Sequence, residues 1–231
     1  MADLVDIPSV NFLVLVYNMR VIQFESNQAK TIFAPEWNFF IYENTICGID
    51  HIKDIILQKE KEIINQYPYL HDWNTGLGEN SLTSRSNYYN LLEWEECSSL
   101  KKKIKDCHDE FTIVTKSKIE PNIYVQCWAN VLRKGEYLKP HQHWTSEYCY
   151  IGGHICFDDY STKTHYINPF NKKTYPSENE KNKITLFPNW IEHYTEPFDG
   201  DTRVTIAFDI ITDVVYNEDI SDEMKSHWIK L

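Results

Sequence analysis

The chain has 231 residues and a formal net charge of −11, and 42% of its residues are hydrophobic. This composition is typical of a globular protein with a sizeable core and excludes a disordered chain. The acidic excess disfavours general nucleic-acid binding, which needs a basic face. The sequence holds only 7 glycines and neither a GxGxxG nor a P-loop pattern, which argues against a glycine-rich phosphate loop.

The cysteines and the N-terminus bear on the compartment. None of the six cysteines forms a CxxC pair, so a cysteine-rich zinc finger is not expected. The first residues, Met1 to Asp6, lack the basic region of a signal peptide. The apolar run from Phe12 to Tyr17 is too short to span a membrane. We therefore expect a cytoplasmic protein with reduced thiols and no membrane association, and leave a homodimer open.

The first half of the chain mixes strands and helices. Apolar and β-branched residues from Val10 to Gln23 predict a strand or hairpin, and Asn38 to Tyr42 predicts a short buried strand. A helix with isoleucines at helical spacing is expected to begin at Asp50 and to end at Pro68. A second helix is expected from Glu93 to His108.

The segment between these helices reads as a loop. Residues Asp72 to Arg85 hold two glycines and show no clear periodicity. Loops with aromatic and hydroxyl residues often line functional sites, although many are simple connections. Both interpretations of this loop stay open.

The second half changes to a period of two. Ile123, Val125 and Cys127 alternate with more polar residues, which indicates a half-buried strand. Further strands are expected around His141 and over the following ranges: Tyr148–Phe157, Lys183–Phe187 and Arg203–Thr212. The polar stretch Ser161 to Asn182 reads as an exposed hairpin or insert.

Many short strands separated by turns indicate an antiparallel jelly roll, that is, a cupin-like double-stranded β-helix in a mainly β protein. We expect one domain over residues 1–231, since no Pro/Gly/Ser-rich linker divides the chain. Residues 1–120 would form a helix-containing support region, with the helices packed on the β-core. Residues 121–215 would form that core, and 216–231 a C-terminal tail with a short helix.

Three histidines stand out within the predicted core. His141 and His143 are two residues apart, so on a strand their side chains project to the same face. His193 follows fifty residues after His143. Imidazole suits iron, zinc, copper and nickel, and a close pair with a distant third ligand can hold a metal against a sheet. The pattern predicts a metal site.

These histidines and Arg203-Val204-Thr205 resemble the 2-oxoglutarate/Fe(II) oxygenases, in particular a group whose first metal motif is His-x-His and which has phage-type members. Trp128-Ala129-Asn130 matches the Trp-x-Asn strand that precedes the motif in that group. Glu147 to Ile151 takes the place of the group's Ser-Gly-Val-Tyr-Tyr strand. The resemblance is specific around His141–Tyr150 and Pro188–Thr205.

The resemblance implies an enzyme that uses Fe(II), 2-oxoglutarate and O₂, and that forms succinate while it oxidises a substrate. The metal ligands would be His141, His143 and His193. The side chains around 2-oxoglutarate would be Arg203, Thr205, Tyr150 and Asn130. Arginine suits the distal carboxylate because its guanidinium binds a carboxylate through two hydrogen bonds, and Thr205 shares a strand face with Arg203.

One departure from the superfamily keeps two alternatives open. Most members have a carboxylate where this chain has His143, and Glu147 could supply one. Gly135, the histidines, Glu147 and Gly153 also approximate a cupin motif, in which Glu147 is a fourth ligand and 2-oxoglutarate is not needed. A jelly roll whose histidines only pack, or bind adventitious zinc, is the third hypothesis.

The sequence does not identify the substrate. Relatives of this type hydroxylate peptides, small metabolites and nucleobases, and the acidity of the chain disfavours nucleic acid. We expect the aromatic loop around Trp73 and the insert Ser161–Asn182 to flank the entrance to the site.

Overall fold

The computed structural model describes residues 10–16, 19–67, 71–72, 74–143 and 147–231, with the backbone alone for 10–16. The helices are α1 (Asp50–Gln66), η1 (Thr83–Arg85), η2 (Leu91–Glu93), η3 (Glu95–Cys97), α2 (Ser98–Val114), α3 (Asp213–Glu218) and α4 (Asp222–Lys225). The strands are β1 (Val10–Val16), β2 (Met19–Glu25), β3 (Asn38–Thr45), β4 (Ile123–Arg133), β5 (Ile151–Cys156), β6 (Tyr160–Ile167), β7 (Thr174–Asn179), β8 (Lys183–Pro188), β9 (His193–Thr195), β10 (Thr202–Thr212) and β11 (Ile229–Lys230). Among the described residues, no helix is both long and apolar enough to cross a membrane.

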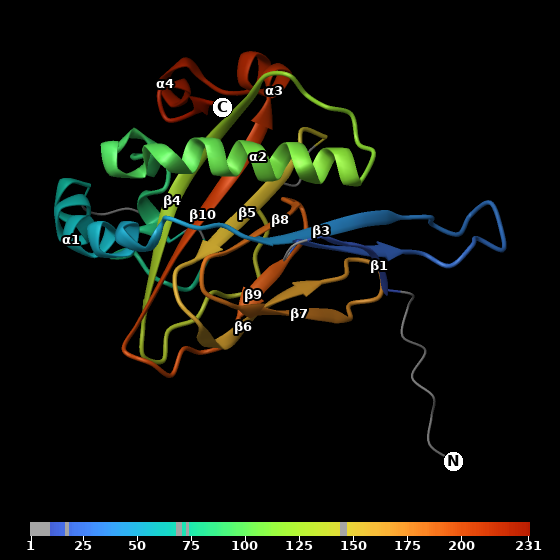
Figure 1. Cartoon of the computed structure of the whole chain (residues 1–231), viewed down its shortest axis with the longest axis horizontal. Helices are drawn as coiled ribbons and strands as arrows, with labels where there is room; N and C mark the ends of the chain where they lie inside the picture. Colours follow the sequence, from blue (N-terminus) through green and yellow to red (C-terminus); the bar gives the residue numbers. More distant parts are fainter. Residues whose placement is uncertain (1–9, 17–18, 68–70, 73, 144–146) are drawn as a thin grey trace.

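The strands form two antiparallel sheets (Figure 1). The large sheet has eight strands in the order β1-β2-β3-β8-β5-β10-β4-β11, and the small sheet has three in the order β7-β6-β9. The pairing of β3 with β8 joins the N-terminal strands to the strands of the second half. The prediction of a mainly β, double-stranded β-helix with helices packed on it is confirmed.

The alternation in β4 and β10 separates a core face from a cavity face. Val125, Cys127 and Ala129 of β4 are buried in one cluster with the apolar residues of α1 and α2. Each large aliphatic side chain buried in this way contributes roughly 1.5–3 kcal/mol. Figure 1 shows α2 lying across β4 and β10. The intervening residues, such as Gln126 and Asn130, face the opposite side and line a cavity.

The segment predicted as an exposed polar hairpin or insert is the β6–β7 hairpin, and it is exposed on one face only. Alternate residues are buried, because their polar groups bond to one another inside the protein. The hydroxyl of Thr164 donates to Oδ1 of Asn179 at 2.9 Å, and Nδ2 of Asn179 donates to the carbonyl of Thr162 at 2.7 Å. The hairpin therefore forms a wall of the barrel.

Two further predictions were only partly right. The expected strand at His141 is a single antiparallel bridge between His141 and His193. The expected C-terminal helix is limited to the one-turn α4, and the chain then returns as β11 beside β4. The predicted helices after Asp50 and Glu93 correspond to α1 and α2, the second preceded by the short turn η3.

Candidate functional site

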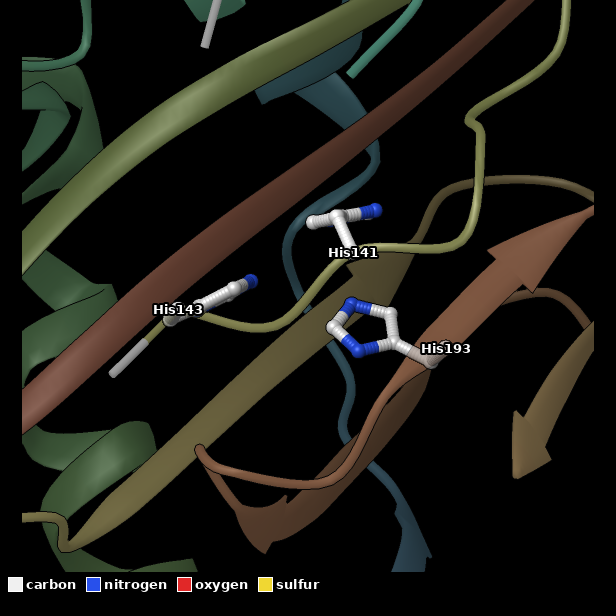
Figure 2. A group of neighbouring side chains, drawn as sticks. All are labelled: His141, His143 and His193. Carbon is white, nitrogen blue, oxygen red and sulfur yellow. The ribbon is translucent and has the colours of Figure 1, made fainter. Parts of the chain in front are cut away.

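Backbone pairing brings the three predicted histidines together (Figure 2). The amide of His193 donates to the carbonyl of His141 at 2.9 Å, and the amide of His141 donates back at 3.1 Å. The amide of His143 donates to the carbonyl of Asn189 at 3.0 Å. One ring nitrogen from each of the three imidazoles lies within 4.8 Å of those of the other two. The three side chains therefore converge on one point, as a metal site requires.

Each ring is oriented through its Nδ1 atom. Nδ1 of His141 lies 2.7 Å from the carbonyl of Lys139, and Nδ1 of His193 lies 3.0 Å from the carbonyl of Ile191. Nδ1 of His143 lies 2.7 Å from Oδ1 of Asp209. All three acceptors are oxygens, so each ring carries its proton on Nδ1 and keeps a lone pair on Nε2. Such bonding fixes the tautomer and orientation of a histidine that binds metal.

Burial favours the uncharged form of two of the three rings, His141 and His193. Loss of hydration, together with the neighbouring His143, lowers the pKa of His141 to about 4. Burial, with the neighbouring His141 as the second cause, lowers the pKa of His193 well below its ordinary value. Both rings are therefore neutral at pH 7, which is the form that coordinates metals.

The cavity beside the histidines has a volume of about 350 Å³ and reaches the predicted Arg203 and Thr205. Both residues lie on β10 and are buried, with 2% and 3% of their surfaces exposed. Their spacing on the strand points both side chains into the cavity, as the sequence predicted. The three imidazoles and Arg203 therefore line the same cavity.

Arg203 is a buried cation without a carboxylate partner among the described residues. Its Nε and Nη1 atoms are buried and form no hydrogen bond within the part of the chain that the structure describes. Its guanidinium carbon lies 5.6 Å from the centroid of the Tyr160 ring. Burial lowers the pKa of the guanidinium. A buried, unpaired cation is unfavourable, so this arrangement suits an anionic ligand.

His154 is a cavity residue that the sequence interpretation missed. It lies on β5 opposite Ala207 of β10, is 8% exposed, and its Nε2 has no hydrogen-bond partner among the described groups. Burial, with Lys183 and Arg203 as further causes, lowers its pKa to about 3. A neutral imidazole there can bond to a ligand held by Arg203. The alternation Gly152, His154, Cys156 was the signal that could have revealed it.

Of the two further residues expected around 2-oxoglutarate, Asn130 lies at the cavity and Tyr150 does not. Asn130 lines the cavity, and its Oδ1 accepts a hydrogen bond of 2.6 Å from the hydroxyl of Thr83. Tyr150 is not among the residues that line the cavity, and its hydroxyl lies 2.8 Å from Nε2 of the buried His108 on α2. The expectation for Tyr150 is thus corrected: β5 begins only at Ile151, and Tyr150 turns toward α2.

Glu147 does not join the histidines. It is exposed and does not belong to the group of converging ligand atoms. The four-ligand cupin alternative therefore has no support in the geometry.

The loop before η1 reaches the cavity, which favours the functional interpretation of that loop. Thr75 and Thr83 line the cavity, and so do Ser86 and Asn87, which follow η1. The carbonyl of Thr75 accepts a hydrogen bond of 2.8 Å from the amide of Lys139, which ties the loop to the segment before His141. Trp73, which we expected at the entrance, lies outside the described residues.

Residues 126–209 match the family model described as "Putative 2OG-Fe(II) oxygenase". This segment contains the three histidines and Arg203, Thr205 and Asp209. No curated protein matches the chain significantly.

Solved structures share the fold at low sequence identity. A prolyl-4-hydroxylase from Pseudomonas putida is 8% identical with a TM-score of 0.54, over 74% of this chain and 92% of that one. A prolyl hydroxylase from Trichoplax adhaerens, in complex with a peptide fragment of hypoxia inducible factor, is 12% identical with a TM-score of 0.51, over 79% and 87%. The carbocyclase SnoK of nogalamycin biosynthesis is 7% identical with a TM-score of 0.54, over 83% and 91%.

Proposed function

We propose that this protein is a 2-oxoglutarate- and Fe(II)-dependent dioxygenase in which His141, His143 and His193 hold the iron and Arg203 anchors 2-oxoglutarate. The activity class rests on the matched family description and on the fold. The residue assignment rests on one observation, namely that three converging imidazoles and a buried guanidinium without a carboxylate partner among the described residues line a single cavity.

The three imidazoles fit Fe(II). Each ring offers Nε2 while its Nδ1 bonds to an oxygen, and three protein ligands leave positions open for a co-substrate and O₂. When bound, the iron would activate O₂ and couple the conversion of 2-oxoglutarate to succinate and CO₂ with oxidation of the substrate. A fourth protein ligand would crowd the open positions, and Glu147 is exposed outside the cluster.

The far end of the cavity fits the distal carboxylate of 2-oxoglutarate. Arg203 can donate from Nε and Nη1, the two nitrogens that have no partner among the described groups. Thr205 adds a hydroxyl, and Nε2 of His154 adds a fourth candidate hydrogen-bonding atom. The carboxylate would neutralise the buried cation, and charge-assisted pairs of this kind are stronger than neutral ones.

Apolar side chains separate these polar groups. Phe187 is buried, and its ring centroid lies 4.8 Å from that of His193. Leu138 also lines the cavity and is 7% exposed. Apolar side chains beside the metal ligands lower the local dielectric constant, which strengthens the electrostatic interactions inside the site.

The substrate would occupy the remaining part of the cavity, lined by Ser86, Asn87 and Gln126 beside the ring of Trp128. These side chains are uncharged and offer hydroxyl and amide groups, which suit a neutral polar substrate. Peptides are the class to test first, because the similar Trichoplax structure holds a peptide fragment. Small metabolites and nucleosides follow.

The test is succinate formation from 2-oxoglutarate by the purified protein with Fe(II) and O₂. The assay is run without substrate and then with peptide, metabolite and nucleoside pools. We expect slow turnover alone, stimulation by one pool, and no turnover by His193→Ala. Absence of succinate under every condition, from a folded protein that retains iron, would contradict the proposed function.

A further inference from the structure

Among the three proposed metal ligands, His143 differs from His141 and His193 in the group that its Nδ1 atom contacts. Nδ1 of His141 and of His193 face neutral backbone carbonyls, whereas Nδ1 of His143 faces the carboxylate of Asp209 at 2.7 Å. The Asp209 and His143 side chains are each 9% exposed. Within the described part of the chain, Asp209 forms an ion pair with no lysine or arginine. The imidazole of His143 is its ion-pair partner among the described residues.

The strands around Asp209 leave room for this pair. Asp209 lies on β10 between Gln126 of β4 and Gly152 of β5. A Cβ atom at position 152 would lie 3.3 Å from Oδ1 of Asp209 and 3.4 Å from Nδ1 of His143. A side chain at this position would press on Oδ1 of Asp209, so the glycine leaves room for the contact between Asp209 and His143.

We propose that Asp209 is a positioning residue that supplies, through His143, the negative charge that a set of three imidazole ligands does not bring to the iron. This inference rests on the proposed function. The hydrogen bond from Nδ1–H to the carboxylate holds Nε2 toward the metal and makes the ring a stronger electron donor. The site thereby keeps an anion next to the metal, although the carboxylate does not touch it.

The stronger donor stabilises Fe(III) more than Fe(II), since the higher positive charge gains more from a nearby anion. Replacing the carboxylate by an amide removes the charge while almost conserving the shape. An amide can also donate to Nδ1, which would place the proton of His143 on Nε2 and block coordination. Both effects weaken metal binding and raise the Fe(III)/Fe(II) potential.

The experiment compares wild type, Asp209→Asn and Asp213→Asn in the full chain. Asp213 is a control four residues further on, whose carboxylate bonds to Tyr124 and does not line the cavity. Metal-free protein is titrated with Co(II), and the iron potential is measured without 2-oxoglutarate. We expect Asp209→Asn to bind Co(II) about 10–100-fold more weakly, with the control unchanged. If the substitution weakens Fe(III) binding tenfold more than Fe(II) binding, the Fe(III)/Fe(II) potential should rise by about 59 mV.

A second variant guards against misfolding of Asp209→Asn. Gly152→Ala keeps both charged groups but crowds them, and we expect several-fold weaker Co(II) binding with an unchanged circular dichroism spectrum. If neither variant weakens Co(II) binding, or if affinity falls while the potential stays constant, Asp209 has only a structural role and the inference is wrong. If wild type and His193→Ala bind Co(II) equally, the inference and the proposed metal site fail together.

Discussion

Arg203 is buried and has no carboxylate partner among the described residues. Its substitution should therefore affect ligand binding and stability differently. We expect Arg203→Leu to weaken 2-oxoglutarate binding at least about 100-fold, because two charge-assisted hydrogen bonds of roughly 1.5–3 kcal/mol each are lost. Metal binding should persist. The unfolding temperature without 2-oxoglutarate should not fall, since an uncompensated buried cation is removed. Calorimetry with 2-oxoglutarate and thermal unfolding measure the two effects.

The matched control is Arg133→Leu. Arg133 ends β4, is partly exposed, and pairs with Glu60 on α1 at 2.6 Å. We expect this variant to bind 2-oxoglutarate as wild type does. Equal affinity of Arg203→Leu and wild type would remove Arg203 from the binding site.

His154 should make the stability of the metal-free protein depend on pH. Its pKa is lowered to about 3 by burial, whereas the unfolded chain takes up a proton near pH 6.5. Between these values the unfolded state binds more protons, so stability falls as the pH falls from 6.5 toward 3 and is fully present above 6.5. His154→Phe removes this contribution. Urea unfolding at pH 6 and pH 4 should show a wild-type loss that exceeds the variant's by about 1.4 kcal/mol per pH unit. Parallel losses would mean that His154 is charged or hydrated in the folded protein.

Sequence spacing identified the site residues that share a strand or a motif. It identified fewer of the site residues whose contacts depend on how the strands pair. His141 and His143 are two apart, and Arg203 and Thr205 share a face of β10, so local geometry was enough to predict that each pair converges. Their roles as ligands stay predictions. The contact of Asp209 with His143 depends on how the segment after β4 crosses β10, which no local pattern fixes. The role expected for Tyr150 failed for the same reason.

Strand β5 must lie flat between β8 and β10, and its glycines allow this. A Cβ atom at Gly153 would lie 2.3 Å from the ring of Phe208 and 2.7 Å from the carbonyl of Thr185. We expect Gly153→Ala to lower the free energy of unfolding by about 1–3 kcal/mol through overpacking. Thermal unfolding of the metal-free variant measures the loss. Equal stability of Gly153→Ala and wild type would show that β5 can move away from β10.

Periodicity predicted β4 and β10 because one face of each is apolar and packs under α1 and α2. It underestimated β6 and β7, because their inward faces are polar and bond to one another inside the barrel. Burial of a polar strand face depends on partners elsewhere in the chain. Composition alone therefore made this hairpin look exposed.

The two sheets together assemble the site from three distant segments. The histidine cluster combines the segment after β4 with the start of β9, and Arg203 enters from β10. The strands N-terminal to residue 121 extend the same large sheet rather than standing apart from it. A single domain over residues 1–231, a cytoplasmic location and a homodimer stay predictions.

Simultaneous binding of Fe(II) and 2-oxoglutarate in one cavity is the claim on which everything else depends. Fe(II) chelated by a 2-oxo acid absorbs visible light through charge transfer, which neither component does alone. The measurement is the visible spectrum of the protein under argon, with Fe(II), with 2-oxoglutarate, and with both. We expect a band only with both ligands, no band in His193→Ala, and a band in Arg203→Leu only at much higher 2-oxoglutarate. A folded wild-type protein that shows no band with both ligands at saturation, or a band that survives in His193→Ala, would contradict the account.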